Sequence, residues 1–291
     1  MKLRIVHRTS YAYAEPATTS HHEAHLTPRQ SEAQRTVTHE LELIPNPATR
    51  RARLDYFGNR TNYFGLTEPH RRFDVVATSL VETSCPDLPE FEHTPPWETV
   101  RSLLECDRRR DVLQATQMRF ASPLVPHVAG LIEYAAPSFP RNSPILVGVR
   151  DLTTRIHRDF AYDQTATNNA TPLATLLATR RGVCQDFSHV MLGCLRSLGL
   201  GARYTSGYLR TRPPPGVKRL IGADATHAWV SVWVPERGWV DFDPTNDICP
   251  SEEHVTLAFG RDFSDVTPLR GVILGGGRHR LEVSVDVEAM G

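Results

Sequence analysis

Gly182-Val183-Cys184-Gln185-Asp186-Phe187 marks the junction between two predicted helices. Apolar residues follow this hexapeptide at helical spacing, and the pattern stops at Gly199, a typical residue at the end of a helix. They are Phe187, Val190, Met191, Cys194, Leu195 and Leu198. The pattern predicts a buried helix whose first turn carries Cys184.

A shorter helix is expected before the hexapeptide. Thr171-Pro172 is typical of an N-cap and a first helical residue, and the helix should run to about Arg181. Gly182 then stands where a left-handed C-terminal cap belongs. The first amides of a helix lack acceptors and favour negative charge, so a cysteine in this position tends to react as a thiolate. We therefore expect Cys184 to be a nucleophile whose own N–H helps to hold an oxyanion.

A histidine opens a predicted strand further along the chain. After His227, apolar and other residues alternate as far as Val234, which indicates a strand. Pro235-Glu236-Arg237-Gly238 is a predicted turn, and Trp239–Asp243 is the return strand. His227 is therefore the candidate base for Cys184.

A third residue should orient the imidazole and fix its tautomer. A turn centred at residue 235 places His227 opposite Asp243. A turn centred one or two residues later favours Asn246 or Asp247 instead, and Asp241 shares the face parity of Asp243. The hairpin pattern alone leaves these alternatives open.

Taken in order, the three segments resemble the core of the transglutaminase-like superfamily, in its bacterial branch with an additional N-terminal β domain. The matching motifs are Gly-Val-Cys-Gln-Asp-Phe, His-Ala-Trp-Val and Asp-Pro-Thr-Asn. The resemblance implies a catalytic set of Cys184 as nucleophile, His227 as base and Asp243 as third member, which decides between Asp243 and its neighbours. Segments at 20–29, 55–59, 260–262 and 271–272 resemble other parts of that branch.

The implied fold class is α+β, with a papain-like core in which the nucleophile helix packs on an antiparallel sheet. We expect an N-terminal β-rich domain over residues 1–90 and a transglutaminase-like core over 91–291. Within the core, ahead of Cys184, helical patterns occur at Trp97–Cys106, Arg110–Met118, Val125–Ala136 and Ile145–Phe160. A C-terminal strand at about 279–289 is expected to return to one of the two sheets.

Composition narrows the class of partner. The chain has 291 residues with 33 basic and 33 acidic side chains, which argues against a nucleic-acid partner. No stretch approaches membrane-spanning length, and the N-terminus lacks a signal-type apolar run. The five cysteines include no zinc-like spacing. We expect a reduced, cytoplasmic protein without membrane contact; the sequence leaves its oligomeric state unknown.

Several other residues are weaker candidates. Gln185 and Tyr162 are candidates for positioning the substrate or the oxyanion, and Trp229 for lining a substrate tunnel, although core packing explains Tyr162 and Trp229 equally well. His189 should point away from Cys184 on the helix. The stretch Arg212–Arg219 is either a substrate-gating lid or an ordinary surface loop.

The sequence thus predicts a transglutaminase-like cysteine acyltransferase or a cysteine peptidase or amidase. The substrate would be an amide bond of a protein or peptide, attacked through a Cys184 thioester. No cofactor and no metal is expected, because no acidic loop resembles a calcium site. The alternative is a non-catalytic protein-interaction module that retains the fold.

Overall fold

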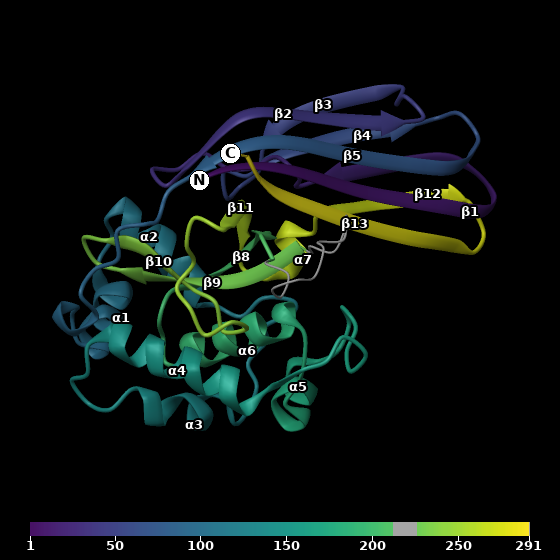
Figure 1. The fold of residues 1–291 in the computed structure, drawn as a ribbon. Coiled ribbons are helices and arrows are strands. Elements are labelled where there is room, and N and C mark those ends of the chain that lie inside the picture. Colours follow the sequence, from purple (N-terminus) through teal and green to yellow (C-terminus); the bar gives the residue numbers. More distant parts are fainter. Residues whose placement is uncertain (212–225, 291) are drawn as a thin grey trace, which may run out of the picture.

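A computed structural model describes residues 1–211 and 226–290, so the stretch Arg212–Arg219 lies outside the described residues. A β-rich layer lies over a second domain, in which helices cover a smaller sheet (Figure 1). This arrangement confirms the predicted α+β class and the N-terminal β-rich region. Within the described ranges, no helix combines the length and the apolar character needed to cross a membrane.

The first sheet is built around one very long strand, β1. On one side β1 pairs with β13 and then with β12, and on the other with β5 and then with β4. β2 adds to β5, and β3 adds to β4. The strands are β1 (Lys2–Ala24), β2 (Gln34–Ile44), β3 (Thr49–Leu54), β4 (Arg60–Leu66), β5 (His70–Thr83), β12 (Leu269–Gly275) and β13 (His279–Met290).

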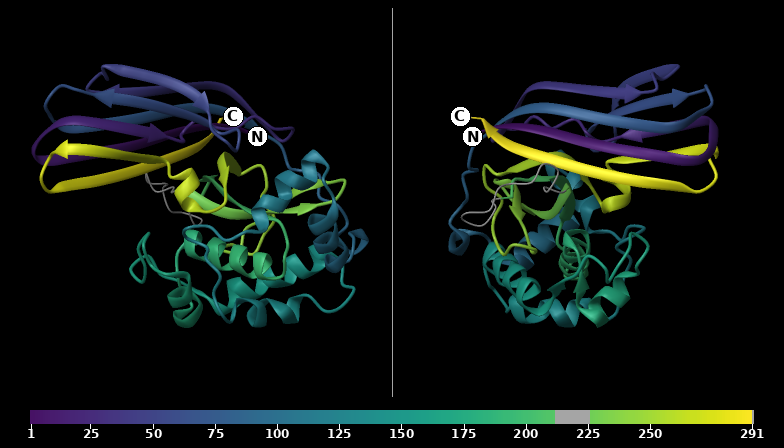
Figure 2. Two further views of the ribbon diagram at one scale, coloured as in Figure 1. Left: turned by 180° about the vertical axis from the view of Figure 1, so that it is seen from behind. Right: turned by 45° about the vertical axis from the view of Figure 1, so that its right-hand side comes forward.

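The C-terminal segment completes this sheet. β13 is the strand expected near 279–289, and it runs antiparallel to the first half of β1, with Lys2 paired to Met290. β12 continues the same edge along the second half of β1 (Figure 2). Residues 269–290 therefore belong to the N-terminal sheet, although they fall within the range 91–291 that we assigned to the core.

The second domain carries a four-stranded antiparallel sheet in the order β10-β9-β8-β11. Its strands are β8 (Ala202–Leu209), β9 (Thr226–Val234), β10 (Gly238–Phe242) and β11 (His254–Gly260), and a short parallel pair joins β6 (Ala161–Tyr162) to β7 (Arg181–Gly182). Helix α6 (Cys184–Ser197) packs against β8 and β9, so the predicted nucleophile helix does lie on an antiparallel sheet.

The remaining helices surround α6 and the sheet (Figure 1). The α-helices are α1 (Trp97–Cys106), α2 (Arg110–Thr116), α3 (Leu131–Ala135), α4 (Ile145–Asp159), α5 (Leu173–Thr179) and α7 (Phe263–Val266); short 3₁₀ turns are η1 (Phe91–His93), η2 (Gln117–Arg119) and η3 (Ala136–Ser138). The helix expected over Val125–Ala136 is shorter than predicted. Ser122 and Val125 form a bridge, and Gly130 has a φ of 92°, so the helix begins only at Leu131.

Side-chain amides of the first domain close the outer edge of β11. Gln34 accepts from the backbone N–H of Thr256 at 2.7 Å and donates to its carbonyl at 2.8 Å. Asn59 does the same for Phe259, at 2.8 Å and 2.7 Å. Backbone polar groups at a strand edge need partners when buried. Two side chains therefore take the place of a fifth strand and fix the two domains together.

Candidate active site

The start of α6 is fixed by a carboxylate in its own first turn. Asp186 accepts a hydrogen bond from the backbone N–H of Val183 at 2.8 Å and from the hydroxyl of Thr167 at 2.6 Å. Burial raises the pKa of Asp186, although these hydrogen bonds favour its ionised form. Asp186 thus satisfies a donor at the N-terminal end of the helix, as an N-terminal capping residue does.

Gly182 does not have the predicted role. The left-handed residue after α5 is Arg180, with a φ of 53°, whereas Gly182 lies in β7 and pairs with Tyr162. A Cβ atom on Gly182 would lie 2.4 Å from Oδ2 of Asp186. Close approach of this carboxylate, and not a positive φ, is therefore what requires glycine at position 182.

Cys184 is the first residue of α6 and is partly exposed. Its N–H belongs to the first turn, where amides have no acceptor within the helix. The ring of Tyr204, on β8, is buried beside it: burial raises the pKa of Tyr204 well above its usual value, and nearby Cys184 and Asp186 act in the same direction. No feature of the sequence separates Tyr204 from an ordinary core tyrosine.

His227 connects Cys184 to Asp243. Its Nε2 lies 2.7 Å from Oδ2 of Asp243, and both side chains are buried. The other ring nitrogen, Nδ1, is left for the hydrogen bond between His227 and Cys184. Burial opposes a charge on His227, but the hydrogen bonds with Asp243 and Cys184 outweigh that effect and raise the pKa of the imidazole to about 10. His227 is therefore an imidazolium at neutral pH.

The carboxylate of Asp243 is held by several donors. Its Oδ1 accepts from the backbone N–H groups of Thr245 at 2.9 Å and Asn246 at 3.3 Å, and its Oδ2 accepts from Nδ2 of Asn246 at 2.7 Å. Burial opposes ionisation, yet the hydrogen bonds from His227, His254 and Asn246 keep the pKa of Asp243 below its usual range. Asp243 is fully buried and ionised.

The hairpin register differs from the one that placed Asp243 opposite His227. Gly238 pairs with Val234 and Phe242 with Val230, so the turn is centred at residue 236. Asp243 still reaches His227 because the chain leaves the strand there and bridges back to Ile248. Asn246 also contacts His227, with Nδ2 3.3 Å from Nε2, so the shifted register brings both predicted partners to the imidazole.

The other acidic alternatives point elsewhere. Asp247 has a φ of 56° and contacts Arg150 at 3.2 Å. Asp241 accepts a hydrogen bond from Nε1 of Trp229 at 3.1 Å. On α6, Nε2 of His189 accepts from the backbone N–H of Phe263 at 3.2 Å, and burial lowers the pKa of His189 to about 4. His189 therefore does not serve Cys184, as its position on the helix predicted.

His254, on β11, is a site residue that the sequence did not indicate. Its Nε2 lies 3.4 Å from Oδ2 of Asp243, and its Nδ1 accepts the backbone N–H of Ser251 at 3.3 Å. It is 11 residues from Asp243 in the chain, outside all three motifs. Only the antiparallel pairing of β11 with β8 brings it to the site.

His227, Asp243 and His254 offer three ligand atoms within 4.8 Å of one another. Ligands of a tetrahedral zinc ion, each about 2.0–2.2 Å from the metal, lie well over 3 Å apart. Oδ2 of Asp243 is 2.7 Å from both Nε2 of His227 and Nδ2 of Asn246, which are hydrogen-bond distances. The arrangement fits a hydrogen-bond network around one carboxylate oxygen, and not a metal site.

The three weaker candidates have different positions. Gln185 follows Cys184 in the first turn of α6 and is partly exposed. Tyr162 is 53% exposed and lies edge-on to Phe187, with 6.4 Å between ring centroids. Trp229 is fully buried, and its ring centroid is 6.1 Å from that of His227. Trp229 packs near the imidazole, and it also lines a cavity of about 370 Å³ between the two domains.

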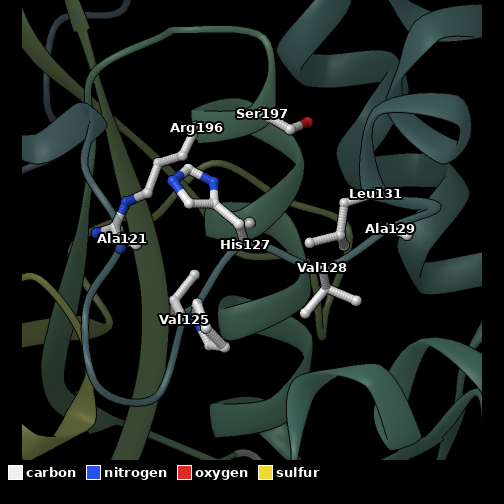
Figure 3. Close-up of a pocket in the computed structure, with 10 residues that line it drawn as sticks. Ala121, Val125, His127, Val128, Ala129, Leu131, Arg196 and Ser197 are labelled. Carbon is white, nitrogen blue, oxygen red and sulfur yellow. The ribbon is translucent and has the colours of Figure 1, made fainter.

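A separate cavity of about 230 Å³ opens near the other end of α6 (Figure 3). Its lining includes Gly193, Arg196 and Ser197 of α6 together with His127. Gly193 is about two and a half helical turns from Cys184. Arg196 is held there by the carbonyls of Met118 and Ala202 at 3.0 Å and 3.1 Å, so this cavity is not part of the thiol site.

Comparisons with known proteins agree with this architecture. Residues 3–82 match the bacterial transglutaminase-like N-terminal region, and residues 136–244 match the transglutaminase-like superfamily. An uncharacterised protein of Mycobacterium tuberculosis is 40% identical over 98% of this chain and 92% of its own length. A protein-glutamine gamma-glutamyltransferase of Pseudomonas aeruginosa is 38% identical over 76 residues, which are 26% of this chain and 11% of that protein.

The fold also matches a solved structure from Cytophaga hutchinsonii that is named as a candidate cysteine protease. The TM-score is 0.75 at 20% identity, over 100% of this chain and 92% of that one. At this identity the match concerns the fold, which includes both domains. Sequence and fold agree, and the chain belongs to the transglutaminase-like superfamily, with the N-terminal region of its bacterial members.

Proposed function

We propose that this protein is a cysteine enzyme that forms a thioester between Cys184 and the acyl group of a protein or peptide amide. One observation carries the proposal: the buried imidazole of His227 lies 2.7 Å from Asp243 and hydrogen-bonds to Cys184 at the start of a helix. A positively charged imidazole beside a thiol at a helix N-terminus is the setting in which cysteine becomes a nucleophile.

In the first half-reaction, the Cys184 thiolate attacks the amide carbonyl carbon and the carbonyl π electrons move to oxygen. The N–H of Cys184, which has no acceptor within α6, is positioned to donate to that oxyanion. As the C–N bond breaks, Nδ1 of His227 gives its proton to the leaving nitrogen. An amine or ammonia departs, and the acyl group remains on sulfur. Asp243 keeps the imidazole oriented throughout.

In the second half-reaction, neutral His227 takes a proton from the acceptor, which attacks the thioester carbonyl. The thiolate leaves, and the imidazolium is restored. Water as acceptor gives hydrolysis, and a primary amine gives acyl transfer. Partial exposure of Cys184 and the 53% exposure of Tyr162 leave room for either acceptor among the described residues.

The test uses the purified full-length chain with a glutamine-containing peptide mixture. We expect a mass increase on the peptide containing Cys184 during turnover, with ammonia or amine released. A fluorescent primary amine separates the two acceptors: its incorporation indicates transfer, and its exclusion with a carboxylate product indicates hydrolysis. Cys184→Ser should abolish release, whereas Cys106→Ser, at an exposed cysteine, should not. Release by Cys184→Ser at the wild-type rate would refute the Cys184 thioester, whereas no release by the wild type would leave an interaction module as the remaining hypothesis.

A further inference from the structure

A cavity of about 370 Å³ lies between the two domains, on the face of the core sheet that α6 does not cover. The first domain lines it with Arg29–Gln34, and the core sheet contributes Arg203, Trp239, Asp241 and Phe259. Neighbours of these sheet residues, such as Tyr204 and Phe242, point into the helix-covered core instead. The cavity therefore lies on the other face of the sheet from α6, although its lining also includes Trp229 and His254, which lie next to the His227–Asp243 pair.

Arg203 is the unusual residue in this cavity. Its guanidinium lies between two aromatic rings, 4.3 Å from the centroid of Trp239 and 3.4 Å from that of Phe259. Its Nε is fully buried, and within the described part of the chain no acceptor and no carboxylate partner is found for it. Burial lowers the pKa of Arg203 to about 9, although Asp241 acts in the opposite direction.

Arg196 is a buried arginine with a structural role, and its hydrogen bonds provide a comparison for Arg203. Its guanidinium donates to the backbone carbonyls of Met118, Ala202 and Arg261 and to the hydroxyl of Ser122. Buried charges are normally paired in this way because desolvation is costly. Arg203 has no such acceptors among the described residues, and stacking on two rings does not supply any. Its Nε is closed off, but the side chain is partly exposed, so the terminal N–H groups remain available to a ligand.

Unused, immobilised guanidinium donors match a planar carboxylate, which accepts two parallel N–H bonds. A dianion fits less well, because Asp241 lines the same cavity and adds a negative charge. Arg29 also lines the cavity, but Glu32 lines it as well and offsets the charge of Arg29. A volume of about 370 Å³ is within the range of small-molecule sites.

We propose that this interdomain cavity binds a carboxylate, with Arg203 as its anchor. The rings of Trp239 and Phe259 hold the guanidinium for the ligand. A second cavity, of about 360 Å³ near Tyr56, borders the same stack, so the rest of the ligand has space on either side. The carboxylate belongs either to a free organic acid or to an acidic group of a peptide, and both present the same chemistry to Arg203.

Binding is measured with the full-length protein by tryptophan fluorescence and by thermal shift. Trp229 and Trp239 line the cavity and are two of the four tryptophans, so they report occupancy. The probes are benzoate, N-acetylglutamate and a short peptide with a glutamate side chain. Their matched controls are benzamide, N-acetylglutamine and the glutamine peptide. We expect only the carboxylates to raise the melting temperature and change the fluorescence.

Two variants assign the binding to Arg203. Arg203→Met should abolish binding and should lower the melting temperature of the free protein less than Arg196→Met does, because it loses two ring contacts but no hydrogen bond to a described residue. Arg203→Lys keeps a positive charge but loses the planar pair of guanidinium N–H donors. It should weaken binding about tenfold or more. Arg51→Met, at an exposed arginine of β3, should bind like the wild type. Arg196→Met should lower the melting temperature, as expected for an arginine with a structural role.

Tighter binding of the glutamate peptide than of N-acetylglutamate would identify a peptide as the source of the carboxylate, and the reverse order a free acid. The proposal is overturned if no carboxylate binds at concentrations up to about 10 mM, if Arg203→Met binds as well as the wild type, or if inorganic phosphate binds as tightly as the carboxylates. A fall in melting temperature for free Arg203→Met equal to that of Arg196→Met would also overturn it, by showing that Arg203 is structural.

Discussion

His254 donates a hydrogen bond from Nε2 to Oδ2 of Asp243 across 3.4 Å. The proton is on Nε2 because Nδ1 accepts the N–H of Ser251 at 3.3 Å. His254 also lies edge-on to Trp229, with 5.3 Å between ring centroids. A histidine outside the three motifs therefore fixes the carboxylate that fixes His227.

Replacing His254 by leucine should lower kcat with little change in KM, since His254 acts through Asp243 and not on the substrate. Loss of one hydrogen bond to a charged group predicts a decrease of about tenfold. His254→Gln, whose amide can still donate, should restore most of the rate. Steady-state kinetics of the three proteins provide the test, with His93→Gln, on an exposed ion pair with Glu90, as control. An equal rise in KM for both His254 variants would argue against a positioning role.

The His227–Asp243 pair should make stability depend on pH in a defined direction. The pKa of His227 is raised from 6.5 to about 10, so its contribution is complete below pH 6.5 and is lost as pH rises towards 10. The pKa of Asp243 is lowered from 3.8, so its contribution is present above pH 3.8 and is lost as pH falls below it. Stabilisation by the pair is therefore greatest between these two unfolded-state values.

Asp243→Asn tests that dependence. Its loss in free energy of unfolding should be largest between pH 3.8 and 6.5, at about 3 kcal/mol, and should shrink towards pH 10. Urea unfolding of both proteins across this range measures the difference. Asp111→Asn, at an exposed residue of α2, is the matched control and should show no such trend. A loss that is constant with pH would mean that the two groups are not paired as ions.

Gly182→Ala should destabilise the protein by about 2 kcal/mol, because its Cβ would lie 2.4 Å from Oδ2 of Asp186. The same change should slow alkylation of Cys184, since Asp186 fixes the start of α6. Asp186→Ala removes the cap and two of the three clashing atoms, Oδ2 and Cγ, and keeps Cβ at 2.8 Å. The double variant should therefore lose less stability than the two single losses added together. Strict additivity in chemical unfolding would show that Gly182 and Asp186 do not interact.

Asn59→Ala should release the edge of β11 at one residue. Phe259 loses partners for both its N–H and its carbonyl, which predicts a loss of about 2 kcal/mol and faster hydrogen exchange at the Phe259 amide. Gln34→Ala should release the N–H of Thr256 in the same way, although the Thr256 carbonyl still accepts the backbone N–H of Arg29 at 3.0 Å. Each variant is the control for the other. Exchange that accelerates equally at both amides in both variants would indicate global loosening in place of two separate contacts.

Local signals in the sequence were sufficient where structure depends on local chemistry. Helical spacing placed α6 with Cys184 in its first turn, and alternation placed β9 and β10. Asp243 was chosen among its neighbours by resemblance and not by register, because the centre of the turn was one residue from the assumed position. A hairpin pattern does not fix that centre when several turn residues are adjacent.

Long-range contacts were not available from the sequence. His254 and Tyr204 reach the site only through the pairing of β8, β9 and β11, and neither has a distinctive neighbouring motif. Gly182 was assigned a common local role of glycine, whereas a carboxylate four residues later in the chain decides its identity. Such packing requirements depend on where side chains meet, and periodicity carries no information about that.

The pairing of Lys2 with Met290 also has a consequence for synthesis of the chain. β1 leaves the ribosome before β2–β11 and the helices of the second domain, and its partner β13 follows all of them. The helices and the small sheet can assemble while one edge of β1 still lacks its neighbour. The first domain is therefore completed only after the second domain has been made, and a ribosome that stalls before β12 would release a chain with a long, unprotected strand edge.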